Sequence, residues 1–275
     1  MAASTSAATV TPAKPRALGW ERLPTWLRRA ILAAGLVVVW HFYAVHKGPL
    51  LLATPWQTLQ AFWDGWGNGH LREATFTTLR LLAEGVGLGA VVAAVLIVFA
   101  TLTKVGEDLL ILLTAVLNPL PGVAVLPLAM LLFGLNENAI RFVIANATVW
   151  PIAIAVATGF KTANQTLVAV GRNVGLSRIR VITDVLAPAA LPSAIAGLKT
   201  AWAFGWRTII ASELFFGVPG STGGLGNYIN DARNNLFTDR LLAGLLTIAL
   251  LGVVFETLFG LIERRTVIRW GMKTS

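Results

Sequence analysis

Six long apolar stretches constrain the fold of this chain more than any other feature. They are Trp26–Val45, Ala74–Leu102, Leu109–Phe133, Ala139–Phe160, Leu191–Phe215 and Leu241–Ile262. A helix needs roughly 20 apolar residues to cross a bilayer, and each stretch is about that long or longer. Only 13% of the 275 residues are charged and 56% are hydrophobic, which leaves too few charged groups to cover a soluble domain. We therefore expect an all-α membrane protein with six spanning helices, rather than a β-barrel of short alternating strands.

The basic residues predict the topology. Lys and Arg gather before the first stretch, between the fourth and fifth, and after the sixth, and they are sparse in the alternate loops. The positive-inside rule then places both termini in the cytoplasm, and the net charge of +9 reflects topology, with no nucleic-acid partner expected. Residues 1–25 read as a disordered cytoplasmic tail and residues 263–275 as a second cytoplasmic tail. No small-x-small cleavage site follows Val45, so the first stretch is expected to be a retained anchor.

Residues 26–73 are expected to form the first spanning helix and an external amphipathic segment. The segment Pro55–His70 carries Trp56, Phe62, Trp63 and Trp66 at spacings that would line one flank of a helix. Aromatic rings favour the membrane interface, so interfacial packing is preferred over docking of a partner. Residues 74–262 are then the main transmembrane domain.

The loop 161–190, between the fourth and fifth stretches, is far longer than a helix reversal needs. It predicts a short helix ending at Val174, a break at Gly175, and a second helix capped by Ser177 and stopped by Pro188. On this second helix the spacing puts three apolar residues on one face, with a charged collar around them. Those apolar residues are Ile179, Ile182 and Leu186, and the collar is Arg178, Arg180 and Asp184. Such a helix suits insertion into a groove on a soluble partner or packing along the membrane surface, and periodicity alone does not separate the two.

The loop resembles the coupling segment of binding-protein-dependent ABC importer permeases. That segment is written Glu-Ala-Ala, three residues, Gly, nine residues, then Ile-x-Leu-Pro. Here Gly175 is followed by nine residues and then by 185–188, Val-Leu-Ala-Pro, while the Glu-Ala-Ala positions 169–171 hold Ala-Val-Gly. The proline-punctuated run 118–134, the run 211–217 (ASELFFG), the glycines of 223–226 and the ending through Trp270 are similar to the sulfonate, taurine and nitrate branch of that family. The similarity extends from about Thr75 to Trp270.

This resemblance implies a bundle of six transmembrane helices of the type I ABC importer permease kind, with a pair of cytoplasmic coupling helices between helices 4 and 5. It also implies a bacterial inner-membrane complex with a second copy of this permease, two copies of a cytoplasmic ABC ATPase, and an external solute-binding protein. ATP and Mg would bind to the ATPase, because this chain lacks a Gly-x4-Gly-Lys-Ser/Thr motif, and the chain itself is expected to bind no cofactor and no metal. The residues expected to contact the ATPase are Ala169, Gly171, Arg172, Gly175, Leu176, Ser177, Arg178, Ile179, Ile182, Leu186 and Pro188.

A second set of residues is expected to line or gate the translocation path: Asn118, Pro119, Pro121, Pro127, Arg141, Trp202, Trp206, Arg207 and Glu213. The prolines would break a span, either for gating or as a static kink. An ionisable residue within a span suggests a functional site, so Arg207 is the first candidate to attract an anion and Arg141 the second. The alternative is that Arg207 pairs with Glu213 or Glu256 to hold the bundle together. Arg80 and Glu84 are four residues apart and read as a structural pair.

The expected function is therefore import of a small, sulfonate-like anion by alternating access, with ATP hydrolysis on another chain. An ATP-independent transporter or channel would normally show internal repeats or paired broken helices, which this sequence does not suggest. The hypothesis of an intramembrane enzyme has less support still. Ser221 does not lie in a Gly-x-Ser-x-Gly motif, and His41, His46 and His70 lack the spacing of a zinc site. Replacing Gly175 with a bulky residue, or Ile182 with Asp, is expected to abolish transport and leave membrane insertion intact.

Overall fold

The computed structural model describes residues 23–216 and 223–268. Predictions for most of the N-terminal tail, for 217–222 with Ser221, and for 269–275 with Trp270 lie outside these ranges. The regular elements of the described residues are all helical. They are α1 (Thr25–Lys47), α2 (Pro55–Gly67), α3 (His70–Leu102), α4 (Lys104–Leu117), η2 (Gly122–Val125), α5 (Leu126–Phe133), α6 (Glu137–Thr162), α7 (Gln165–Asn173), α8 (Arg178–Val181), η3 (Ile182–Leu186), α9 (Ala187–Ala189), α10 (Leu191–Phe216), α11 (Leu225–Asn234), α12 (Thr238–Glu263) and η4 (Arg264–Ile268).

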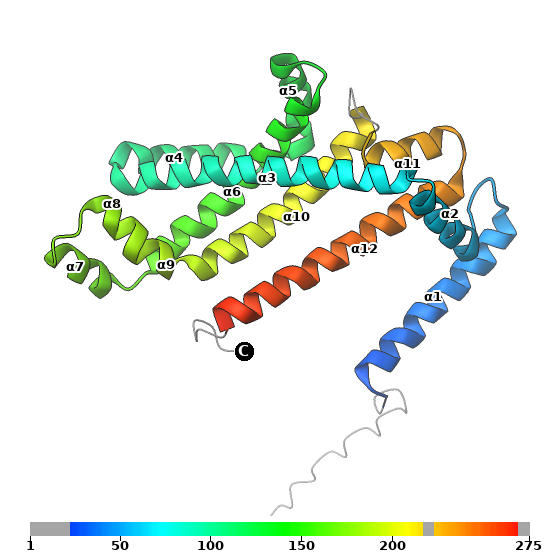
Figure 1. Ribbon diagram of the computed structural model, residues 1–275, viewed down its shortest axis with the longest axis horizontal. Coiled ribbons are helices and arrows are strands. Elements are labelled where there is room, and N and C mark those ends of the chain that lie inside the picture. Colours follow the sequence, from blue (N-terminus) through cyan, green and yellow to red (C-terminus); the bar gives the residue numbers. More distant parts are fainter. Residues whose placement is uncertain (1–22, 217–222, 269–275) are drawn as a thin grey trace, which may run out of the picture.

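Up to six of these units can cross a membrane, in agreement with the predicted all-α bundle. Among the described residues, α1, α3, α6 and α12 are each long and apolar enough to do so alone. Two bent helix pairs would raise the number to six if each is one broken span and not a re-entrant loop: α4 with η2 and α5 turns by 97°, and α8–α9 with α10 turns by 72°. Figure 1 shows α3 running along the bundle with α6, α10 and α12 oblique to it.

The break in the third span follows from its prolines, as predicted. α4 ends at Leu117 with Asn118 as its C-cap, and Pro119 and Pro121 have no N–H with which to continue the helical hydrogen-bond ladder. η2 then packs closely on α10, because a Cβ at Gly122 would lie 2.6 Å from Thr208 Oγ1. α5 restarts with Pro127 in its first turn and packs against the start of α6, with which it projects from the bundle (Figure 1).

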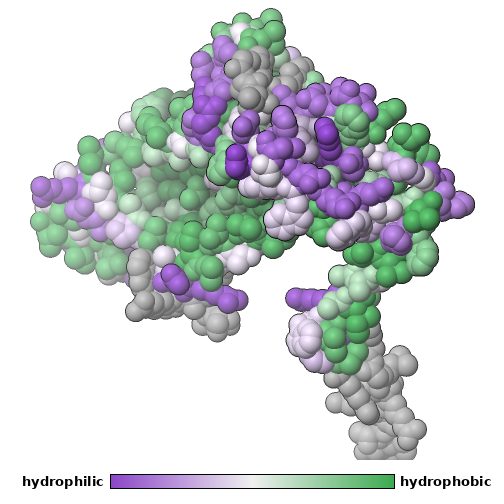
Figure 2. Space-filling model, turned by 45° about the vertical axis from the view of Figure 1, so that its right-hand side comes forward, coloured by the Kyte–Doolittle hydropathy of each residue, from purple (hydrophilic) through white to green (hydrophobic). Residues whose placement is uncertain are grey.

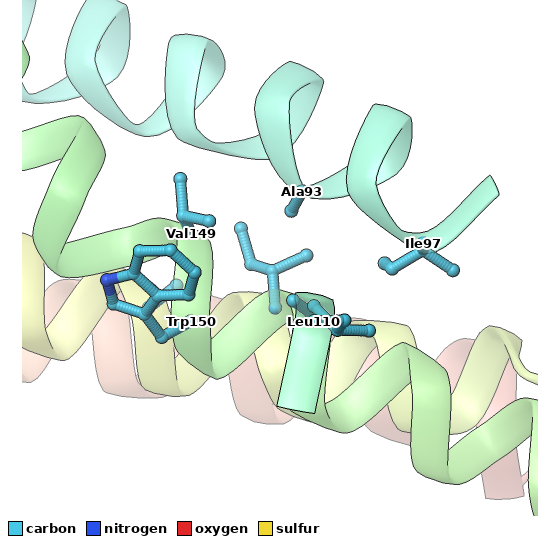
Figure 3. Packing of buried hydrophobic residues seen from close by; sticks show 8 residues of the cluster. Ala93, Ile97, Leu110, Val149 and Trp150 are labelled. Carbon is cyan, nitrogen blue, oxygen red and sulfur yellow. The ribbon is translucent and has the colours of Figure 1, made fainter. Parts of the chain in front are cut away.

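Small residues allow α3, α6 and α10 to approach closely and form the core. A Cβ at Gly85 of α3 would lie 2.6 Å from the side chain of Ile144 of α6, so the backbone of α3 lies directly against this side chain. Figure 3 shows the neighbouring cluster, in which Ala93 and Ile97 of α3 lie close to Leu110 of α4 and to Val149 and Trp150 of α6. By contrast, only 6% of the most apolar 18-residue window is buried in each of α1 and α12. Much of the apolar surface of these two helices is therefore available to lipid or to another chain.

Short helices lie at opposite ends of the bundle. One end is formed by α7, α8 and α9, and we call it the coupling end. The other is formed by α2 and α11, and we call it the α11 end (Figure 1). Figure 2 shows hydrophilic side chains gathered over the α11 end, and a broad hydrophobic face along the bundle. This distribution fits a protein whose bundle lies in lipid and whose ends meet water.

The aromatic residues of α2 do not all share one flank as predicted. Trp56 and Trp63 are largely exposed, whereas Phe62 and Trp66 pack against the buried cluster of Leu71, Ala74 and Leu225. A capping box between Thr54 and Gln57 fixes the start of this helix. Half of the aromatic set therefore anchors α2 to the bundle, and half faces outward at the α11 end.

Candidate coupling segment and translocation face

The predicted glycine elbow is a Schellman motif at the end of α7. Leu176 N–H donates to Gly171 O and Gly175 N–H donates to Arg172 O, both at 3.0 Å. Gly175 has a φ of +84°, the left-handed conformation that favours glycine at this position. A Cβ on Gly171 would lie 3.3 Å from Leu176, so the turn closes tightly. The glycine that the sequence identified is thus required by the backbone conformation.

The second half of the loop begins as predicted and ends differently. Ser177 Oγ accepts a hydrogen bond from Arg180 N–H, as expected of a helix cap. Pro188 does not stop the helix, since it lies inside α9 and the chain bends only at Ala190. Before it, η3 widens into a π-helical turn in which Ala187 N–H donates to Ile182 O. Because Pro188 offers no N–H, the regular ladder is already interrupted here, and the wider turn lets the helix pass the proline.

The predicted shared face of Ile179, Ile182 and Leu186 is wrong. Ile182 is 6% exposed and Leu186 7%, and both pack in a cluster with Ala163, Val168 and Val181. Ile179 is 60% exposed. The buried pair therefore holds the loop to the bundle, and only Ile179 remains free for a partner.

Exposed apolar residues on α7 and α8 form a different surface from the one predicted, which we call the coupling patch. It consists of Leu167, Val170, Val174 and Ile179. The three α7 residues, including its C-cap, follow helical spacing, and Val168 and Gly171 on the same helix are buried. Periodicity in the sequence missed this surface because α7 is short and has apolar residues on both faces. Of the other predicted contact residues, Ala169, Arg172, Arg178 and Pro188 are exposed and Leu176 is half-buried.

Two polar residues of α10, Thr200 and Arg207, lie on one exposed face of this helix with Phe204 between them. Asn118, Thr200 and Phe204 line a cavity of about 340 Å³ together with residues of α6. Arg207 lies on the same face of α10, because positions 200, 204 and 207 follow helical spacing. Its side chain is exposed and makes no ion pair with a described residue. We call Asn118, Thr200, Phe204 and Arg207 the translocation face.

The two tryptophans expected beside Arg207 point elsewhere. The ring centroids of Trp202 and Phe255 of α12 are 4.4 Å apart, and those of Trp206 and Phe255 are 6.2 Å apart. These rings fill the space between α10 and α12. Glu256 of α12 pairs with Lys199 at 2.5 Å, so the alternative in which it pairs with Arg207 is wrong.

Arg141 is held in an ion-pair network between α3 and α6. It contacts Glu84 at 2.5 Å and Glu137 at 2.6 Å, and it also donates to Asn138. Arg80 pairs with Glu137 at 2.6 Å, so the predicted Arg80–Glu84 pair is wrong. The reason is that α6 begins beside the middle of α3 and supplies a closer partner to each residue. Arg141 is therefore occupied by carboxylates, in contrast to Arg207.

Glu213 is fully buried at the α11 end and does not pair with Arg207. Its carboxylate accepts hydrogen bonds from Thr78 Oγ1 of α3 at 2.9 Å and from Gly226 N–H of α11 at 3.0 Å. Thr78 in turn accepts from Leu225 N–H at 2.8 Å. A carboxylate at a helix N-terminus is favoured by the free amides there and by the helix dipole. We call Glu213, Thr78 and the first two amides of α11 the α11 clasp.

The α11 clasp explains the glycines around it. A Cβ at Gly226 would lie 2.6 Å from the backbone nitrogen of Leu214, and one at Gly224 would overlap the Glu213 carboxylate. Sequence reasoning missed Thr78, whose only signal was a hydroxyl within an apolar span. The clasp joins α3, α10 and α11 at one buried point.

The fold and the projecting elbow together define a class, the permeases of type I ABC importers. The chain has the same fold as a chain from an amino acid ABC transporter, with a TM-score of 0.59 and 16% identity over 72% of this chain and 94% of that one. A chain of the inward-facing MetNI methionine ABC transporter gives a TM-score of 0.50 and 17% identity over 76% of this chain and 93% of that one. At these identities the similarity establishes the fold.

Sequence similarity establishes the family. Residues 85–268 match the family described as binding-protein-dependent transport system inner membrane component, and the chain belongs to this family. It is 32% identical to the putative aliphatic sulfonates transport permease protein SsuC of Escherichia coli, over 89% of this chain and 93% of that one. It is 29% identical to the taurine transport system permease protein TauC of E. coli (84% and 86% covered) and 28% identical to the nitrate import permease protein NrtB of Synechocystis (92% and 94% covered). The chain is thus a multi-pass membrane transport subunit, and permeases of this kind work with an ATPase and a solute-binding protein.

Proposed function

We propose that this permease imports a small anion of the sulfonate kind and that Arg207 attracts it during passage. The observation that carries the proposal is an exposed guanidinium within a spanning helix that no described carboxylate neutralises. A cation in this position is costly in lipid and is expected to face water, a partner chain or an anion. Arginine binds sulfonate or carboxylate oxygens through two parallel N–H donors. Three relatives are named for transport of sulfonates, taurine and nitrate, and each of these solutes carries a negatively charged group.

We further propose that two copies of this chain meet around the translocation face, so that Arg207 and Asn118 line a shared path. The support is that polar side chains on the outside of a bundle are unfavourable toward lipid. The proline break beside this face then supplies a hinge at which the path can close, since local rearrangement is easiest where the helical ladder is already broken.

The proposed assembly has its coupling end and both termini in the cytoplasm of a bacterial inner membrane. Two ABC ATPases hold ATP and Mg, and one of them contacts the coupling patch of each permease copy. The solute-binding protein docks at the α11 end. Ile182 and Leu186 pack against the bundle, which leaves Ile179 and the exposed α7 residues of the coupling patch available for a partner. Exposed apolar side chains on a basic helical segment suit a groove on a soluble protein.

Cysteine crosslinking tests the ATPase contact directly, because the native chain contains no cysteine. A Val174→Cys or Ile179→Cys variant is expressed in its native membrane, extracted gently and treated with a short thiol crosslinker, and its products are identified by mass spectrometry. We expect a crosslink to a nucleotide-binding chain from either exposed position and none from Ile182→Cys, which is buried. Absence of any ATPase from an intact preparation, together with absence of crosslinks, would contradict the assembly.

Uptake measurements test the role of Arg207. Proteoliposomes that contain the complex and its binding protein are compared for uptake of labelled taurine, nitrate and bicarbonate. We expect Arg207→Gln to lower uptake of the preferred anion at least tenfold, because a charge-assisted contact contributes about 1.5–3 kcal/mol. Arg264→Gln removes the same charge from an exposed residue that, like Arg207, forms no ion pair with a described residue, and it serves as the matched control. Equal loss in both variants would show that Arg207 acts through general charge alone.

A further inference from the structure

Two adjoining cavities lie beneath the coupling segment, on the opposite side of α7 from the coupling patch. One, of about 440 Å³, is an open cavity lined by residues of α3, α4, α6 and the inner face of α7. The other, of about 460 Å³, lies between the end of α3 and the α8–η3 turn. Thr101, Arg172 and Leu186 line both, so the two cavities meet at these residues.

The part of the first cavity nearer the middle of the bundle is mostly apolar, because the hydroxyls of Thr114 and Thr158 in its lining bond back to their own helices. Its walls include Ile97, Leu110, Ile111, Ile154, Ala157 and Phe160. Figure 3 shows Ile97 and Leu110 close together at the edge of the packed core beside it. A space with such walls at membrane depth favours hydrocarbon over water.

The part nearer the coupling segment is basic. Lys161 lines the first cavity, Arg178 the second, and Arg172 both. None of the three forms an ion pair with a described residue. The carboxylate in the lining is Glu107, and it is already paired with Lys104 at 2.9 Å. The lining therefore carries three cations against one carboxylate, and that carboxylate, Glu107, is attracted by Lys161 as well as by Lys104.

We propose that these cavities bind an anionic phospholipid, with its phosphate between Arg172, Arg178 and Lys161 and the start of an acyl chain against Ala157 and Phe160. The proposal rests on the orientation proposed above, which puts this end in the cytoplasmic leaflet. Basic pockets between spanning helices on that side suit anionic headgroups, and arginine forks match phosphate oxygens. A free inorganic anion would not cover the apolar wall, and an apolar peptide would leave three cations unpaired.

The lipid would act on the coupling segment from within. Gln165, Val168 and Arg172 follow helical spacing on the inner face of α7, whereas Leu167, Val170 and Val174 lie on the outer face. A headgroup bound on the inner face holds α7 and α8 against the end of α3 and leaves the outer face free for the ATPase. Occupancy of this site therefore positions the coupling segment without competing for the coupling patch.

Native mass spectrometry tests lipid binding on the extracted permease. The complex in mild detergent is mixed with equal amounts of dioleoyl phosphatidylglycerol and dioleoyl phosphatidylcholine, and the ratio of the retained adducts is measured. Each basic residue near a membrane surface strengthens binding of an anionic lipid roughly fivefold, so Arg172→Gln with Arg178→Gln should lower the ratio roughly 25-fold. Replacing both with Lys should restore most of it. Ala157→Trp fills the apolar part, leaves the charge unchanged, and should also lower retention.

The matched control is Arg264→Gln with Arg265→Gln, which removes two exposed charges at the proposed cytoplasmic end of α12. An equal fall in this control, or full retention in Ala157→Trp, would overturn the proposal. Displacement of phosphatidylglycerol by millimolar inorganic phosphate would also overturn it and indicate a free-anion site. The same preparation shows whether an ATPase is present. Lipid preference without an ATPase refutes the proposed assembly alone, and an ATPase without lipid preference refutes the lipid site alone.

Discussion

The α11 clasp makes a strong prediction about stability, because one hydroxyl serves two buried groups. Thr78 Oγ1 donates to Glu213 and accepts from the Leu225 amide, and both side chains are fully buried. Thr78→Val keeps the shape of the side chain but removes both contacts. A hydrogen bond to a buried carboxyl group contributes about 1–3 kcal/mol, and a buried amide left without a partner costs about 1–3 kcal/mol. We expect the variant to lose roughly 3 kcal/mol of unfolding free energy.

The assay is reversible unfolding of the purified permease in mixed micelles, followed by tryptophan fluorescence and circular dichroism. Thr78→Ser is the matched control, since it keeps the hydroxyl and removes one methyl group, at a cost of about 1 kcal/mol. An average interhelical hydrogen bond in a membrane protein contributes only about 0.6 kcal/mol. If Thr78→Val lost no more than that, the clasp would be an ordinary contact and the reasoning from its two buried partners would be refuted.

Three further predictions concern backbone and packing. Gly175→Val should abolish ATP-driven uptake while leaving membrane insertion intact, because a β-branched residue at a φ of +84° is strained by at least about 1–2 kcal/mol; insertion is checked by protease protection. Ile182→Ala should cost about 2–5 kcal/mol in the unfolding assay, whereas Ile179→Ala should leave stability unchanged and weaken ATPase recovery in pull-downs. Gly85→Ala should cost about 1–3 kcal/mol by crowding α6, while Gly87→Ala, which meets nothing within 4 Å, should not destabilise the permease. Equal stability in either pair of variants would contradict the packing described here.

The helices and the elbow could be predicted from the sequence because their determinants are local. Apolar length predicts spans, and prolines at 119 and 121 predict a break whatever surrounds them. Gly175 was identifiable for the same reason, since the turn needs a left-handed residue and glycine adopts one at low cost.

Side-chain partners between helices could not be predicted in this way. Arg80 and Glu84 satisfy the spacing of an intrahelical pair, yet each bonds across to α6 because of where that helix begins. The same holds for Ile182, whose spacing matched that of Ile179 although only one of them faces the bundle. On a short helix flanked by bends, the burial of a face is decided by the packing of the neighbouring helices, about which local periodicity carries no information.

One helix connects the features that this transport subunit needs. α10 begins at the 72° bend after α9, carries Arg207 in its second half and carries Glu213 in its last turn. At 1.5 Å per residue its 26 residues span about 39 Å, enough to cross the hydrocarbon core. Because Ile182 and Leu186 fix the coupling segment to the bundle, a displacement of that segment is passed to the start of α10. Because Glu213 is bonded to α3 and to the first turn of α11, the far end of α10 cannot move without α11 moving or the clasp opening. Arg207 and the clasp residue Glu213 therefore lie on the same helix, which follows directly after the coupling segment.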